Sequence, residues 1–316
     1  MSNNSNTSKI SIDLLKGIFL GIALSTTSLH LLNHHKKKSS SNEKNTEPES
    51  QTINNNENKT VIPPSMRNEL ISRTSLYFPE TINTHITQSS IIVLGCGGVG
   101  SHAAISLARS GVKHLRLIDM DMVTLSSLNR HACATLKDVG IPKVEAVKKT
   151  IEEICGGEVY CQIDTRCEMY TGERNHLLDW VDSIKGTKQK NWDFIVDAID
   201  DIPTKTALLA ECYRRNIRVV TCMGAGGKSD PTRLHIGDLN SASRDPLAAK
   251  LRYGLKKIDP AIATSENVSA IFSSEKVVAK LADFTEEQKQ QGIENFGAID
   301  GMRVRVLPVL GRYVNI

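Results

Sequence analysis

The sequence predicts an α/β fold built on a doubly wound, mostly parallel sheet, and three observations carry this prediction. An apolar run at 91–94 passes directly into a glycine-rich turn. A stretch at 101–109 with small and apolar residues at helical spacing follows that turn. From residue 61 onward, strand-like and helix-like segments alternate along the chain. Alternation of this kind is typical of a parallel sheet whose crossover helices cover both faces.

The N-terminal part of the chain differs from the rest in composition. Residues 10–32 form an apolar stretch of about the length that crosses a bilayer. Three lysines at 36–38 follow it and favour a cytosolic position for that side. We expect residues 1–38 to be a membrane anchor with its flanks. Residues 39–60 are polar and low in complexity, so we expect a disordered tether there, and we assign 61–316 to the α/β domain.

A mitochondrial presequence and a cleaved signal peptide are alternatives for the apolar stretch, but the sequence agrees less well with either. A mitochondrial presequence is rich in arginine, and residues 10–32 contain none. A cleaved signal peptide has a basic N-terminal region and an A-x-A site, whereas this chain offers only Lys9 and no such site. Both stay open as alternatives to a helical membrane anchor.

Charge and cysteine content limit the class of function. The formal net charge is +4 and the pI is about 8.6, so the surface is mildly basic and compatible with an RNA or membrane partner. The seven cysteines include no C-x-x-C pair, which argues against a disulfide framework or a structural zinc site. We therefore expect free thiols in a reducing compartment.

The glycine-rich turn predicts a nucleotide site. Gly95, Gly97 and Gly100 match G-x-G-x-x-G, and Gly98 adds a fourth glycine. Between a strand and a helix, such a turn brings backbone N–H groups up to a phosphate. The next strand-like run ends in Asp119, where a ribose-binding carboxylate would lie. Together these features predict a Rossmann-like sheet with a bound nucleotide.

The residues that follow favour a triphosphate over a dinucleotide. Asp121, Asn129 and Arg130 come after Asp119, and Lys143 follows Pro142. A nicotinamide enzyme binds its pyrophosphate through backbone and helix dipole, whereas a triphosphate carries more charge for arginine and lysine to meet. Proline suits the first position of a helix, so we expect Lys143 in a first turn. A cation there opposes the helix dipole, and a bound phosphate would reverse that cost.

A third strand-like run, at 192–200, supplies candidate metal ligands. It ends in Asp197 and Asp200, with Asp201 adjacent. Carboxylates at the end of a strand suit a Mg²⁺ held through phosphates and water. Asp201 is also a good helix N-cap, a role that leaves the other two free for metal. A fourth strand is expected at 217–222.

Taken in order, the glycine turn, D-x-D, N-R, lysine and D-A-x-D resemble the ubiquitin-activating-type adenylating superfamily. The resemblance implies that the nucleotide is ATP, cleaved to give an acyl-adenylate. It places Asp119 at the ribose, and Arg130 and Lys143 at the phosphates as catalytic residues. It also makes Asp200 a catalytic ligand of the metal. Arg73 resembles an arginine that reaches the nucleotide of the partner subunit, which implies a homodimer.

Four further segments narrow the resemblance: 221–239, 245–252, 271–276 and 303–311. They are similar to segments of the tRNA threonylcarbamoyladenosine dehydratase family. That family implies ATP-dependent cyclisation of threonylcarbamoyladenosine in tRNA, with release of AMP and pyrophosphate. An N-terminal span followed by a tether is similar to the fungal members, which lie on the mitochondrial outer membrane with the catalytic domain facing the cytosol. Family members continue past the last matching segment, so we expect the domain to be truncated at its C-terminus.

Two other functions stay open at this point. The same ATP site would serve an enzyme that adenylates a ubiquitin-like or sulfur-carrier protein, for which Cys222 is the best-placed transfer cysteine. A catalytically impaired, membrane-tethered paralogue is the other. For the tRNA itself, a helix starting at Asp245-Pro246 presents basic residues away from its apolar face that are candidates for phosphate contacts: Lys250, Arg252, Lys256 and Lys257.

Overall fold

The structure is a computed structural model that describes residues 64–156, 160–180, 191–242 and 244–276. The chain divides into two units, Met1–Val61 and Ile62–Ile316, and every described residue lies in the second. None of the described helices has the length and apolar character that a membrane crossing requires. The predicted span, the tether and the segment at 303–311 fall outside the described residues.

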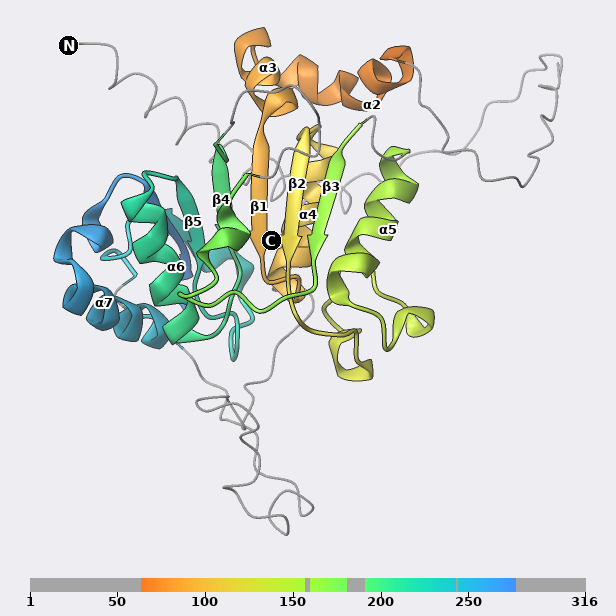
Figure 1. The fold of residues 1–316 in the computed structure, drawn as a ribbon. Coiled ribbons are helices and arrows are strands. Elements are labelled where there is room, and N and C mark those ends of the chain that lie inside the picture. The colour runs from red at the N-terminus through yellow and green to blue at the C-terminus, as the bar shows by residue number, and fades with distance from the viewer. Residues whose placement is uncertain (1–63, 157–159, 181–190, 243, 277–316) are drawn as a thin grey trace, which may run out of the picture. The chain divides into compact units, whose positions relative to one another are not determined.

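A seven-stranded sheet forms the centre of the described residues, in the order β3-β2-β1-β4-β5-β7-β6. Each neighbouring pair is parallel except β6 with β7. The predicted doubly wound, mostly parallel α/β sheet is therefore confirmed (Figure 1). The strands are β1 (Ser90–Leu94), β2 (His114–Ile118), β3 (Gln162–Arg166), β4 (Phe194–Asp197), β5 (Val219–Cys222), β6 (Leu234–Gly237) and β7 (Val268–Ser273).

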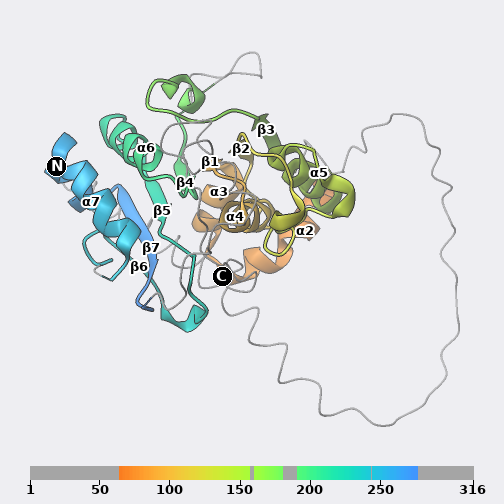
Figure 2. The same ribbon diagram turned by 90° about the horizontal axis from the view of Figure 1, so that it is seen from below.

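Helices cover both faces of this sheet. From β1 the chain runs outward through β2 to β3, and it then returns to the other side of β1 to build β4 and β5. Because crossovers of parallel strands are right-handed, α4 and α5 lie on one face and α6 and α7 on the other (Figure 2). The helices are α2 (Pro64–Tyr77), α3 (Glu80–Gln88), α4 (Gly98–Arg109), α5 (Lys143–Cys155), α6 (Ile202–Arg214) and α7 (Pro246–Ile258).

Capping residues set the ends of these helices. The Asp201 carboxylate accepts the N–H of Thr204 at the start of α6, and Asp245 caps α7 in the same way through two N–H groups. Two helices begin at a different residue from the one predicted, in each case within one turn. The helix expected from residue 101 begins at Gly98, and Pro142 stands at the N-cap, so Lys143 is the first residue of α5.

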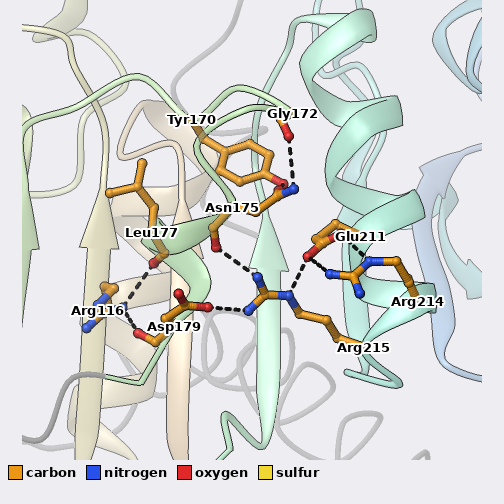
Figure 3. Close-up of polar contacts among 9 residues, drawn as sticks. All are labelled: Arg116, Tyr170, Gly172, Asn175, Leu177, Asp179, Glu211, Arg214 and Arg215. Atoms are coloured by element: carbon orange, nitrogen blue, oxygen red, sulfur yellow. Dashed lines mark hydrogen bonds and ion pairs between the residues drawn. The ribbon is translucent and has the colours of Figure 1, made fainter.

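The chain between β3 and β4 packs against α6 and is fixed there by two arginines (Figure 3). Arg116, buried in β2, donates from Nη1 to the carbonyl oxygens of Leu177 at 3.0 Å and Asp179 at 2.5 Å. Arg215, just after α6, donates from Nη1 to the Asp179 carboxylate at 2.6 Å. Arg215 also pairs with Glu211 of α6. Tyr170, Leu177 and Leu178 of this segment thereby join the buried core.

Candidate functional site

The glycine turn lies between β1 and β4, where the strand order reverses and open α/β sheets bind ligands. Gly95 has a φ of +85°, and a Cβ there would come within 2.8 Å of the Ala198 carbonyl oxygen after β4. A Cβ on Gly100 would lie 1.6 Å from the Gly95 oxygen. By contrast, a Cβ on Gly97 would meet no atom within 4 Å. Protein packing therefore explains Gly95 and Gly100, while the space beside Gly97, at the N-terminus of α4, could take an anion.

Asp119 ties the glycine turn to the end of β2. Its Oδ2 accepts the N–H of Cys96 at 2.6 Å, and its Oδ1 accepts the N–H of Asp121 at 2.8 Å. Burial raises the pKa of Asp119, an effect that the Asp121 N–H and the Lys143 charge oppose. Each carboxylate oxygen can accept a second hydrogen bond, so Asp119 can hold the turn and a ribose hydroxyl together. Burial also keeps the pKa of the Cys96 thiol well above its usual range.

Lys143 is paired with an exposed acid at the start of α5. Its Nζ lies 2.6 Å from Asp121 Oδ2, and its backbone N–H donates to the Asp121 carbonyl at 2.9 Å. The Lys143 side chain is 11% exposed and that of Asp121 51%. Asp121 offsets the unfavourable position of a cation at a helix N-terminus. Because solvent reaches Asp121, an incoming phosphate can replace it as the partner of Lys143.

Arg130 and Asn129 lie on the loop between β2 and α5. Arg130 Nη1 donates to the Ser126 carbonyl at 2.8 Å and to Asn129 Oδ1 at 3.0 Å. The Arg130 carbonyl lies 3.2 Å from Nε2 of His102 in α4. The first turns of α4 therefore hold the backbone that carries the arginine, while the guanidinium lies at the surface of its own loop.

His131, next to Arg130, is a site neighbour that sequence reasoning missed. Its Nδ1 accepts the N–H of Ala134 at 3.1 Å, which leaves the proton on Nε2. Burial, followed by the charge of Lys143, lowers the pKa of His131 to about 4. The ring is therefore neutral at physiological pH. Its position directly after N-R was the available signal.

Asp197 and Asp200, the two predicted metal ligands, have different surroundings. Asp197 is fully buried, and its Oδ2 lies 2.6 Å from Lys205 Nζ and 2.6 Å from Thr221 Oγ1. Its Oδ1 accepts the N–H of Ile199 at 3.1 Å. Asp200 is exposed at the carboxyl edge of the sheet. Among the described residues, no cluster of three or more histidines, cysteines and carboxylates is arranged to hold a metal ion. The metal role of both residues stays a prediction, and Asp197 has an ion-pair partner that the sequence analysis did not foresee.

Lys205 was overlooked, although a signal for it existed. It lies on α6 at helical spacing with Leu208, Leu209 and Cys212, all of which are buried in the core. A lysine on the apolar face of a helix requires a buried partner. Thr221 on β5 completes the arrangement, because its hydroxyl oxygen accepts from Lys205 Nζ at 3.0 Å.

Two further candidates are a thiol at the end of β5 and an arginine on α2. Cys222 ends β5, and burial raises the pKa of its thiol to about 12, so it is protonated at neutral pH and poorly suited to nucleophilic attack. Arg73 is exposed on α2. Helix α2 lies beyond the amino ends of the strands (Figure 1), whereas the glycine turn follows the carboxyl end of β1. Arg73 is thus at the opposite end of the sheet from the glycine turn of its own chain.

Comparison with known proteins identifies the family of this chain. The family model described as ThiF family matches residues 71–306. The chain belongs to the ThiF family. This ThiF-family chain is 42% identical over 233 residues to tRNA threonylcarbamoyladenosine dehydratase 2 of Saccharomyces cerevisiae, covering 72% of this chain and 48% of the yeast protein. It is 36% identical over 198 residues to tRNA threonylcarbamoyladenosine dehydratase of Escherichia coli, covering 62% of this chain and 69% of the bacterial protein.

A solved structure agrees with these relatives. The E. coli tRNA N6-threonylcarbamoyladenosine dehydratase TcdA in complex with ATP matches the ThiF-family chain with a TM-score of 0.60 at 32% identity. That match covers 69% of this chain and 86% of the solved chain. The predicted resemblance to the adenylating superfamily and its dehydratase branch is confirmed. The chain spans about half the length of the yeast relative.

Proposed function

We propose that this protein is an ATP-dependent tRNA threonylcarbamoyladenosine dehydratase. One observation carries the proposal: the yeast and bacterial relatives named as this enzyme are 36–42% identical to the chain over its α/β domain, and a solved bacterial dehydratase holds ATP. The chain supplies a phosphate-accepting glycine turn beside a lysine and an arginine. This arrangement suits the activation of a carboxylate by adenylation.

The proposed reaction joins and breaks bonds in two steps. The threonyl carboxylate of the modified base attacks the α-phosphorus of ATP, and the α–β bond breaks to release pyrophosphate. The urea group of the same substituent then attacks the activated carbonyl, and the bond to AMP breaks. The net change is loss of one water and closure of a ring. Intramolecular attack has an effective molarity on the order of 10⁵ M or more when well oriented, so no nucleophilic cysteine is required.

Each predicted site residue has a role in this scheme. The N–H groups of Gly97 and Gly98 meet phosphate oxygens, and Asp119 accepts a ribose hydroxyl. Lys143 leaves Asp121 and, with Arg130, neutralises the charge that develops as the α–β bond breaks. Asn129 orients the Arg130 guanidinium.

Mg²⁺ would be held at the carboxyl end of β4 by one protein carboxylate, with phosphates and water as its other ligands. When bound, the ion would neutralise phosphate charge during adenylation. We assign Asp200 as the protein ligand, because its carboxylate is exposed beside the glycine turn. Asp197 is neutralised by Lys205 and serves instead to hold the Asp200 loop through the N–H of Ile199.

We further propose a homodimer in which Arg73 of each subunit serves the nucleotide of the other. Its position at the far end of its own sheet supports this role. Sedimentation of the purified chain should give a dimer at micromolar concentration, and a monomer with normal ATP binding would contradict it.

Attachment to the mitochondrial outer membrane, with the catalytic domain in the cytosol, is proposed from the apolar residues 10–32. The full-length chain should then fractionate with that membrane, and a chain starting at residue 61 should not.

The deciding experiment supplies full-length protein with ATP, Mg²⁺ and tRNA that bears threonylcarbamoyladenosine. Mass spectrometry after mild digestion should show a nucleoside lighter by one water, together with AMP and pyrophosphate. Lys143→Ala, prepared in parallel, serves as the inactive control. If AMP forms only with a di-glycine-tailed carrier protein, the chain adenylates a protein instead. If ATP binds but no product of either kind forms, the chain is an inactive paralogue.

A further inference from the structure

We infer that the exposed side of α7 is a docking surface for tRNA, where lysines contact the sugar-phosphate backbone and Tyr253 stacks on an unpaired base. This inference rests on the proposed function and extends it to a surface separate from the nucleotide site. Four features of α7 support it: its charge, its exposed aromatic ring, its anchoring and its contrast with α5.

The charge of α7 is entirely positive. The helix PLAAKLRYGLKKI contains three lysines and one arginine and no acidic residue. Lys250, Lys256 and Lys257 are exposed. Of the acids at its two ends, Asp245 is buried against Lys228, which leaves Asp259, whose carboxylate accepts the N–H of Ala261, against the four cations of the helix. The outer side of α7 therefore carries a net positive charge at the surface.

Tyr253 lies in the middle of these lysines. It is 66% exposed, so its ring is open to a partner. Lys250, Tyr253 and Lys257 are spaced three and four residues apart and so share one side of the helix. Lys257 Nζ lies 4.4 Å from the centroid of the Tyr253 ring. A flat ring between cations is a suitable platform for a nucleobase whose phosphates contact the lysines.

The surface is also firmly anchored. Ala248, Leu251 and Leu255 on the inner side of α7 are buried in the core. Arg252 Nη1 donates to the carbonyl oxygens of Leu239 at 2.9 Å and Ala242 at 3.0 Å.

A shallow hollow of about 250 Å³ adjoins the Tyr253 ring. It is smaller than the roughly 300–1,000 Å³ of small-molecule sites. Its lining residues are Asn240, Arg252, Tyr253, Lys256, Pro260 and Ala263.

Helix α5 shows that this charge is specific to α7. Both helices have 13 residues, but α5 balances its three lysines with three glutamates. A control set with the same charge as the three α7 lysines therefore lies outside the inferred surface. It consists of Lys113 before β2 and Lys148 and Lys149 of α5. An anionic membrane would also attract lysines. The hollow beside Tyr253, however, is lined in part by the hydrogen-bonding side chains of Asn240, Arg252 and Lys256, which favours a partner with hydrogen-bonding groups, such as RNA.

The test measures binding of a tRNA transcript to the full-length protein at several salt concentrations. The variant K250Q/K256Q/K257Q should bind about tenfold or more weakly, and its salt dependence should fall by about 0.7–0.9 per lost phosphate contact. The control K113Q/K148Q/K149Q should bind as wild type. Tyr253→Ala should weaken binding about fivefold or more, with Tyr253→Phe close to wild type, because stacking needs only the ring.

Three outcomes would overturn the inference. The α7 and control triples could weaken tRNA binding equally, or Tyr253→Ala and both triples could bind as wild type. The α7 triple could instead lose binding only to phosphatidylserine-containing vesicles while tRNA binding is unchanged, which would make α7 a membrane surface. Failure of the dehydratase proposal is separable. Wild type would then bind tRNA without dehydrating its base, and the α7 triple would still bind more weakly.

Discussion

Two lysine–aspartate pairs lie at the carboxyl edge of the sheet, and they differ in access to water rather than in geometry. Lys205–Asp197 and Lys143–Asp121 both have an N···O distance of 2.6 Å. The first pair has both side chains 0% exposed, whereas the Asp121 side chain of the second is 51% exposed. A buried pair cannot exchange its partner without leaving a charge in the core. A solvated pair can, so only Lys143 is able to move from a carboxylate to a phosphate.

The largest effect should follow from breaking the buried pair. Lys205→Met leaves the Asp197 carboxylate buried with only Thr221 and Ile199 as hydrogen-bond donors. We expect the free energy of unfolding to fall by about 3–5 kcal/mol, measured by urea denaturation. Adding Asp197→Asn to the same chain should restore part of the loss, because no unpaired charge remains. A loss below about 1 kcal/mol for Lys205→Met would show that the two pairs are equivalent.

Breaking the exposed pair, Lys143–Asp121, should reduce activity and leave stability nearly unchanged. Lys143→Ala should reduce ATP–pyrophosphate exchange about 10²–10³-fold, the cost of losing one well-placed charge-stabilising donor. Its free energy of unfolding should change by about 1 kcal/mol or less, since Asp121 is solvated. Lys148→Ala on the same helix is the matched control and should leave exchange unchanged. Unaltered exchange in Lys143→Ala would move the phosphate role to another cation.

In a third pair, Lys149–Asp138, the exposure of the acid lies between those of the acids in the buried and the exposed pair. Breaking it should give the smallest effect. Hydrogen bonds from the Thr135 hydroxyl and N–H, followed by Lys149, lower the pKa of Asp138 from 3.8 to about 2. The folded protein therefore favours the carboxylate, and this contribution is present above pH 4 and lost as pH falls towards 2. Asp138→Asn should reduce stability by about 1 kcal/mol at pH 7 and by nothing measurable at pH 2. A difference that persists unchanged at pH 2 would exclude ionisation as the cause.

Sequence patterns predicted most elements around the site and failed where the pattern was weak. The apolar runs and caps located β1, β2, β4, β5 and the helices between them. Strand β3, QIDTR, has one apolar residue because it is an edge strand with half-buried side chains, so no periodicity marked it. The residue pattern predicted both Asp197 and Asp200 as metal ligands and gave no sign that Asp197 is buried in an ion pair. Their difference depends on Lys205 and Thr221, which reach Asp197 only through the packing of α6 and β5.

The crossing from β3 back to β4 has a consequence for the order in which the protein folds. β1 pairs with β2 across a short stretch of chain, but Ser90 meets its hydrogen-bond partner Asp193 across 103 residues. Contacts of such long range form slowly, since loop closure must precede them. Ala198, which limits the space at Gly95, follows β4. A nascent chain therefore has the glycine turn early but lacks its neighbouring wall until β4 pairs with β1, so we expect the proposed nucleotide site to form only after that pairing.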